Sequence, residues 1–213
     1  MGTIKQGILG GFSGKVGTVI GSTWKGITYM RGIALKIKNP KTDLQIAQRQ
    51  KWSVTMKFLK AFTLMLQDSY RFLAVKMSAF NAAFQEIIDN ALQGTYPNIA
   101  VDFPNAMLAK GSLPGALNAT AASTVAATIA VTWLDNAGDL GALDTDTATI
   151  AVYSPAKNEA VVVSGLATRV SNSQAVTVPS SFSGDLVHVY IYFNSADKKL
   201  VSNSAYAGAV TVA

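Results

Sequence analysis

The chain lacks cysteine and has a single histidine, His188, among its 213 residues. The missing thiols exclude disulfides, thiolate metal sites and cysteine nucleophiles. One imidazole excludes histidine-rich zinc sites, and any Ser–His–Asp triad would have to form around His188. In the strand-like run "LVHVYIYF" a lone histidine is more often structural than catalytic. We therefore expect that the protein is not an enzyme and holds no cofactor or metal.

Charged residues are scarce as well. They make up 14% of the chain, against about 25% in an average soluble protein, while the hydrophobic share is 49%. The mean hydropathy is +0.27. Because a monomer that stays in solution usually presents more charge, we predict that part of this surface is covered in an assembly.

Long apolar runs are missing too. No stretch reaches the roughly 18 apolar residues of a membrane helix. The apolar piece at residues 8–12 is short and is interrupted by Gly10 and Gly11, which is not typical of a signal peptide. We therefore expect no membrane partner and no recognisable signal peptide.

The charges that are present are unevenly distributed. The net charge is +6, but residues 1–60 hold eleven Lys or Arg against one acid, Asp43, and residues 111–213 hold four bases against seven acids. Such asymmetry can mark a nucleic-acid or membrane surface. It can equally guide the basic end of one subunit onto the acidic end of the next.

Nine of the seventeen glycines lie in residues 1–38, and the stretch "GGFSGKVGTVIGSTWKGITYMRG" suggests a phosphate-binding loop. A P-loop around Gly14-Lys15 requires glycine at position 9 and a hydroxyl residue at position 16. The chain has Leu9 and Val16 there. No βαβ pattern surrounds the glycines, so a dinucleotide site is not indicated either.

The same stretch favours extended structure. Residues 15–31 are rich in Thr, Val and Ile, which have high strand propensity. Glycines at 17, 21 and 26 permit close backbone approach, and we predict two strands turning near Gly21-Ser22. An isolated hairpin is barely stable in water, so this basic β-ribbon arm, residues 1–38, needs cover from its own helices or from a neighbouring subunit.

A helical region is predicted for residues 39–110. Asn39-Pro40 precedes it, and Thr42 with Gln45 forms a capping box. Apolar residues then recur at helical spacing from residue 44 to residue 66. A second helix is expected from Ser78 to about residue 91, with Gly94 as its stop signal. We expect the two helices to pack as a hairpin.

Residues 111–123 are small and uncharged, and we predict a linker there. Beyond it short alternating runs predict strands. In "ATIAVTW", Ile129, Val131 and Trp133 share one face. Further strands are expected at 147–153, 159–164, 174–178, 186–193 and 206–212. The predicted fold is α+β: a glycine-rich β-ribbon and a helical hairpin, followed at residues 124–213 by an immunoglobulin- or fibronectin-like β-sandwich.

Carboxylates offer few functional sites. Glu86 and Asp89 are explained by a solvated helix face. One loop, "DNAGDLGALDTD", collects oxygen ligands that calcium prefers, but without the regular spacing of a calcium loop. Its four carboxylates are Asp135, Asp139, Asp144 and Asp146.

Basic residues that alternate with aromatics in the first half are the best candidates for binding. Nucleic-acid surfaces combine phosphate neutralisation with base stacking in this way, although no nucleic-acid-binding motif accompanies them. Aromatic anchors with flanking cations also suit a protein interface. The candidate partner-binding residues are Trp24, Lys25, Tyr29, Arg31, Arg49 and Trp52.

Two stretches carry a resemblance: "IKQGILGGFSGKVGTVIGSTWKGITYMRG" and "NPKTDLQIAQRQKW". The pair resembles an uncharacterised family of roughly 200-residue bacterial and phage-associated proteins, and the likeness extends through "GTYPN" and "GDLVHVYIYF". The second stretch is also similar to a segment of phage virion proteins. The resemblance implies a non-enzymatic, virion-associated protein with an immunoglobulin-like C-terminal domain. We accordingly expect a virion or cytoplasmic location.

Taken together, these patterns predict a structural or assembly protein. Its basic N-terminal half would contact protein subunits, either further copies of itself or other virion proteins, and its sandwich would be displayed. Nucleic-acid binding by the basic half is the first alternative, and a surface adhesion module with binding loops on the sandwich is the second.

Overall fold

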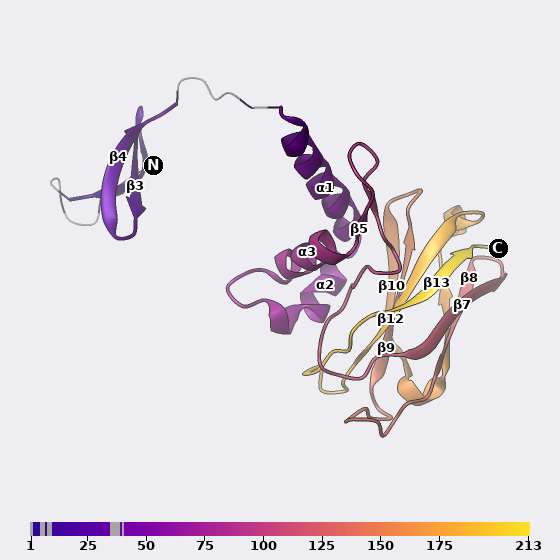
Figure 1. The fold of residues 1–213 in the computed structure, drawn as a ribbon. Coiled ribbons are helices and arrows are strands. Elements are labelled where there is room, and N and C mark those ends of the chain that lie inside the picture. The colour runs from indigo at the N-terminus through magenta and orange to yellow at the C-terminus, as the bar shows by residue number, and fades with distance from the viewer. Residues whose placement is uncertain (1, 5–6, 8–9, 35–38, 40) are drawn as a thin grey trace. The chain divides into compact units, whose positions relative to one another are not determined.

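The computed structural model describes residues 2–4, 7, 10–34, 39 and 41–213. Leu9 and Pro40 therefore lie outside the described residues. The chain divides into two compact units, residues 1–42 and 43–213. Figure 1 labels most of their helices and strands.

The N-terminal unit is a four-stranded antiparallel sheet in chain order. Its strands are β1 (Thr3–Ile4), β2 (Phe12–Val16), β3 (Val19–Trp24) and β4 (Ile27–Gly32). The prediction of two strands with a turn near Gly21-Ser22 is wrong, because both residues lie inside β3. The turns fall instead at residues 17–18 and 25–26, where Gly17 and Gly26 adopt positive φ.

Three α-helices lie in the described part of the second unit: α1 (Asp43–Lys60), α2 (Thr63–Ser69) and α3 (Ala79–Asn90). The first predicted helix breaks after Lys60, whose carbonyl accepts a 2.9 Å hydrogen bond from the Thr63 hydroxyl. A 3₁₀ turn, η1 (Arg71–Leu73), follows α2. The helical region is thus a three-helix cluster rather than a two-helix hairpin.

The second predicted helix starts where the sequence indicates. Ser78 is the N-cap of α3, and its hydroxyl accepts from the Asn81 amide at 3.2 Å. Gly94 does not end α3. It lies between two short paired strands, β5 (Leu92–Gln93) and β6 (Ala100–Val101), where a Cβ atom would come within 2.1 Å of the Asn98 carbonyl oxygen.

The second unit continues as two sheets. Their strands are β7 (Leu117–Val125), β8 (Thr128–Leu134), β9 (Thr147–Ser154), β10 (Glu159–Thr168), β11 (Ser173–Thr177), β12 (Leu186–Asn194) and β13 (Ala205–Thr211). One sheet has the order β10-β9-β12-β13 and the other β11-β8-β7. All six strands expected after residue 124 are confirmed, which supports an α+β fold with a β-sandwich.

The linker predicted at residues 111–123 is wrong. β7 begins at Leu117, and before it the buried Leu113 donates its amide to the Val201 carbonyl at 3.1 Å. The Ala, Thr and Ser side chains of this strand give little hydrophobic contrast. Small inward residues, Ala119 and Ala121, nevertheless pack against the sandwich core.

The sandwich core forms between the two sheets. Ile129, Val131 and Trp133 of β8 are buried in it, as the alternation predicts. The Trp133 ring meets Phe193 of β12 edge-on, with centroids 6.0 Å apart.

A second core covers the outer face of the larger sheet. Tyr153, Tyr190 and Tyr192 point away from the sandwich core and are buried against helical residues that include Phe58 and Phe62. The helices lie along one side of the sandwich (Figure 1). Because β9 and β12 are buried on both faces, the helical region and the sandwich form one packed unit.

Candidate interaction surface

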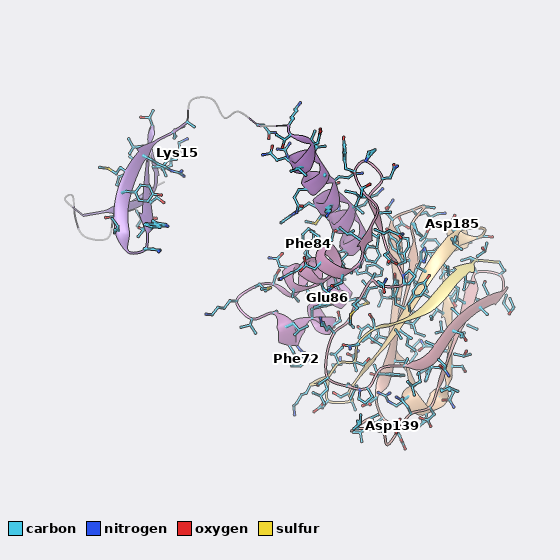
Figure 2. All side chains as sticks on the ribbon, in the orientation of Figure 1. Lys15, Phe72, Phe84, Glu86, Asp139 and Asp185 are labelled. Carbon is cyan, nitrogen blue, oxygen red and sulfur yellow. The ribbon has the colours of Figure 1, made fainter. Side chains whose placement is uncertain are left out.

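One face of the N-terminal sheet combines aromatic, aliphatic and basic side chains. The register pairs Trp24 with Ile27, Ser22 with Tyr29 and Ile20 with Arg31, and directly paired residues share a face. Lys15 pairs with Ile20 and extends the face across β2; Figure 2 labels it on this sheet. We call this set the aromatic–basic face: Lys15, Ile20, Trp24, Ile27, Tyr29 and Arg31.

The large side chains on this face are exposed. Trp24 is 63% exposed, Ile27 66% and Tyr29 44%. Every residue of β4 is exposed, and β4 is an edge strand. Among the described residues of this unit, the one buried position is Gly21, so the sheet has no buried apolar side chain of its own there.

Gly21 shows why this sheet needs glycine. A Cβ atom at position 21 would lie 2.1 Å from the Phe12 carbonyl oxygen and 2.6 Å from the Phe12 ring. This is the close approach that the sequence suggested. Gly17 and Gly26 have a different role, because their Cβ positions are open and their positive φ angles serve the turns.

The β3–β4 turn presents a cation next to the tryptophan. Lys25 and Gly26 both have positive φ, +47° and +85°, the pattern of a type I′ hairpin turn. The Lys25 ammonium lies 4.9 Å from the centre of the Trp24 ring. Lys25 therefore joins the edge of the aromatic–basic face although it lies outside the strands.

The charge of this unit has one sign. Residues 1–42 contain seven Lys or Arg and no Asp or Glu, which leaves eleven basic and twelve acidic residues in 43–213. Cations surround the exposed aromatic rings of the N-terminal sheet without a carboxylate in the same unit to neutralise them.

The other two candidate residues lie on α1, in the second unit. Arg49 is exposed, and Trp52 packs against Phe84 of α3 with ring centroids 4.7 Å apart. Trp52 also lines an apolar groove of about 530 Å³ with Met56, Met77 and neighbouring residues. The structure thus brings Trp24, Tyr29 and Arg31 together on one face and places the α1 pair on another unit.

Sequence reasoning missed Ile27 and Lys15 as members of the face. Both follow from the period of two once the strand boundaries are known, since Ile27, Tyr29 and Arg31 alternate along β4. The misplaced turn at Gly21-Ser22 concealed this alternation.

The remaining sequence candidates have structural partners. His188 is buried, its Nδ1 lies 2.8 Å from the Tyr206 hydroxyl, and Phe103 stacks on its ring at 3.7 Å. Burial lowers the pKa of His188. Glu86 forms an ion pair with Lys110 at 2.7 Å. These contacts account for both side chains within the fold.

Asp146, one of the four loop carboxylates, is fully buried and pairs with the equally buried Arg169 at 3.1 Å. No group of three or more metal-ligating His, Asp or Glu side chains occurs among the described residues. In that same part of the chain, no helix has the length and apolarity to cross a membrane.

A family of unknown function, DUF6266, matches residues 11–208. The chain belongs to this family. The match begins within the N-terminal sheet and ends in the last strand, so it spans both units. The expected resemblance to an uncharacterised family is thereby confirmed.

Among solved structures, the chain is similar to the fn3 domain of the human collagen alpha-1(XX) chain. The sequences are 14% identical, the match covers 48% of this chain and 87% of that domain, and the TM-score is 0.36. No match was found among curated proteins.

Proposed function

We propose that this chain is a non-enzymatic assembly protein, a component of a phage virion or a virion-like particle, in which copies associate through the aromatic–basic face. The observation that carries the proposal is the exposure of Trp24, Ile27 and Tyr29 on one side of a thin sheet. A sheet of this size needs a covered apolar face to be stable. Aromatic residues and arginine are also the side chains that dominate protein interfaces.

The edge of the sheet adds a second support. Within the described residues, the outer edge of β4 pairs with no other strand, and such an edge is a template for pairing with another chain. The strand carries few of the features that natural proteins use to block edge pairing, because it holds one charged residue, Arg31, and no proline.

Charge favours another copy of the chain as the partner. The N-terminal unit is wholly basic, whereas residues 111–213 carry seven acids against four bases. Complementary fields raise association rates and fix orientation. The sandwich of one copy therefore offers an acidic surface for the N-terminal sheet of the next.

For the displayed sandwich we propose a fibronectin-type rather than a constant immunoglobulin arrangement. In a constant immunoglobulin domain the fourth strand joins the sheet of the first, second and fifth strands. In this sandwich, counted from β7, the fourth strand is β10, and it pairs with the third strand, β9. The strand orders of the two sheets are β11-β8-β7 and β10-β9-β12-β13.

The test is the mass of the particle in solution. Trp24→Ser with Tyr29→Ser should reduce the assembly to single chains in sedimentation velocity, because both anchors of the face are removed. Met30→Ser is the matched control: Met30 is 71% exposed, but its register with Gly21 places it on the opposite face of β4. Assembly of the double variant at wild-type concentrations contradicts the proposal, as does assembly of a chain without residues 1–42.

The arrangement of cations and aromatic rings on this face supports nucleic-acid binding as a second candidate function. Lys15 and Arg31 flank Trp24 and Tyr29 on a single face, and single-stranded nucleic acids bind where cations alternate with stacking rings. Binding of this kind weakens steeply with salt, with a slope set by the number of phosphates neutralised. Titrating a fluorescent oligothymidylate at two ionic strengths distinguishes the two functions. If the aromatic–basic face serves only self-association, the chain should not bind the oligonucleotide.

A further inference from the structure

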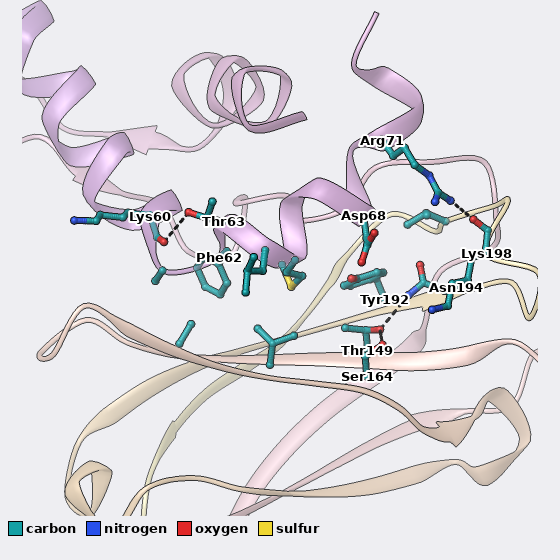
Figure 3. A pocket seen from close by; sticks show the side chains of 16 residues that line it. Lys60, Phe62, Thr63, Asp68, Arg71, Thr149, Ser164, Tyr192, Asn194 and Lys198 are labelled. Atoms are coloured by element: carbon teal, nitrogen blue, oxygen red, sulfur yellow. Dashed lines mark hydrogen bonds between the residues drawn. The ribbon is translucent and has the colours of Figure 1, made fainter. Parts of the chain in front are cut away.

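A cavity of about 580 Å³ lies in the second unit, between the α1–α2 connection and the outer face of the larger sheet (Figure 3). Pockets that bind small molecules typically measure about 300–1,000 Å³. Three strands, β9, β10 and β12, supply the floor, and residues 60–71 supply the opposite wall.

The floor carries a row of hydrogen-bonding side chains. The hydroxyls of Thr149 and Ser164 lie 2.7 Å apart, and the Asn194 amide donates to the Thr149 hydroxyl at 3.1 Å. These residues come from β9, β10 and β12, so the paired strands hold the row in place. Ser164 is exposed and Asn194 is half-buried, which leaves their polar groups accessible to a ligand.

The opposite wall is charged. Arg71 and Lys198 supply two cations, and Asp68 supplies one carboxylate. Lys60 also lines the cavity, but its ammonium points away from these residues (Figure 3). Arg71 donates a hydrogen bond to the Lys198 carbonyl, which ties the β12–β13 loop to the helical wall. Figure 3 shows Asp68 near Tyr192 and Asn194, with Arg71 and Lys198 beside them. The cavity therefore has an excess of positive charge and an acceptor that can take hydroxyl protons.

Apolar groups complete the lining. Phe62 and Met65 are buried beside the cavity, whereas Leu64 is 80% exposed and Val162 is 38% exposed. Exposed aliphatic side chains beside a polar floor suit a ligand that has a C–H surface as well as hydroxyl groups.

We propose that this cavity binds a sugar acid, a molecule with several hydroxyls, one carboxylate and an aliphatic ring face. The carboxylate meets the cations of Arg71 and Lys198, and the hydroxyls bond to Asp68, Ser164 and Asn194. The ring face lies against Leu64 and Val162. A fatty ligand would offer no partner to the Asp68 carboxylate or to the cations of Arg71 and Lys198, and a bare phosphate would make no use of the carboxylate or of the aliphatic wall.

The experiment is NMR titration of the full-length ¹⁵N-labelled chain, followed at the side-chain amide of Asn194. The probes are glucuronate, glucose and inorganic phosphate. Glucuronate should shift this amide saturably. Glucose should bind about tenfold more weakly, as expected for loss of one charge-assisted contact, and phosphate should leave the amide unmoved. Methyl glucuronide separates a free sugar acid from the end of a glycan, and binding of either supports the proposal.

Substitutions test which side chains bind the carboxylate and the hydroxyls of the ligand. Lys198→Ala should weaken glucuronate binding about fivefold or more while leaving glucose binding unchanged. Lys199→Ala, at the next residue and absent from the lining, is the matched control. Ser164→Ala should weaken both sugars, since it removes a hydroxyl from the floor. Thermal unfolding of each variant checks that the fold is retained.

Three results overturn the proposal. They are the absence of any saturable shift with the sugars, equal affinity for glucose and glucuronate, and phosphate binding as strong as glucuronate binding. None of these outcomes depends on the N-terminal sheet, so they leave the proposed assembly function intact.

Discussion

Replacing Arg169 with methionine should severely destabilise the second unit. Arg169 and Asp146 are both 0% exposed, and the guanidinium donates to the Asp146 carboxylate at 3.1 Å and 3.3 Å. It also donates to the Pro114 carbonyl at 3.0 Å and to the Asn136 side chain. Methionine fills much of the volume but leaves Asp146 buried and unpaired.

The expected cost follows from that geometry. Removing one partner of a buried ion pair typically costs about 3–5 kcal/mol. One oxygen of Asp146, Oδ1, already lacks a hydrogen-bond partner within the described residues. Without Arg169, the carboxylate would keep the 2.9 Å hydrogen bond from the Leu143 amide but would lose its counter-ion. For a unit of this size each kcal/mol lowers the melting temperature by roughly 2–4 °C, which gives a decrease of about 6–20 °C.

Calorimetry and urea unfolding of the full-length chain measure the effect. Adding Asp146→Leu to Arg169→Met should recover part of the loss, because the unpaired charge is then gone. Lys199→Met, which removes the exposed ion pair with Asp197, is the control and should change stability little. A loss from Arg169→Met no larger than that of Lys199→Met refutes the reasoning, and so does a double variant no more stable than the single one.

Further expectations concern both units. Gly21→Ala should disrupt the N-terminal sheet, because the new methyl group would overlap the Phe12 carbonyl; faster amide exchange across β3 and β4 measures this, and unchanged exchange contradicts it. Lys25→Gly should slow exchange in the same strands, since glycine removes a left-handed strain of about 1–2 kcal/mol; faster exchange would show that the lysine contact with the Trp24 ring matters more. Burial lowers the pKa of His188, so stability should be constant above pH about 6.5 and fall as the pH drops below it. Melting curves from pH 8 to pH 5 should show a shallower fall for His188→Gln, and parallel curves count against this assignment.

Strands with strong alternation were predictable from the sequence. Ile129, Val131 and Trp133 of β8 turn inward as their spacing requires, and the apolar alternation of β12 also marks a strand. The alternation does not show which part of the chain packs on the outer face of β12. Tyr190 and Tyr192 are buried because the helical region packs on them, and His188 is covered by Phe103; both contacts join segments that are far apart in the sequence.

The errors have local causes. β7 was missed because its Ala, Thr and Ser residues resemble a linker, although edge strands of a sandwich need only small inward side chains. The turn was placed at Gly21-Ser22 because glycine usually marks turns, whereas Gly21 is required by the close approach of Phe12. The β3–β4 turn is formed by Lys25 and Gly26, which both have positive φ.

The two proposed binding surfaces differ in how far the sequence alone identifies their residues. Tyr29 and Arg31 share a face by the strand period of two, whereas Trp24 joins them only through the two-residue turn at residues 25–26. The cavity collects Asp68, Thr149 and Asn194 from three distant segments, and only the packing of the helices on the sheet brings them side by side.

The most direct test of the assembly proposal is hydroxyl-radical footprinting of the full-length chain over a range of protein concentrations, with oxidation read by mass spectrometry. We predict that Trp24 and Tyr29 become protected as the protein associates, while Met30 on the opposite face stays reactive. Constant oxidation of Trp24 and Tyr29 across concentrations at which the particle mass rises, or a chain that stays a single copy throughout, contradicts the account.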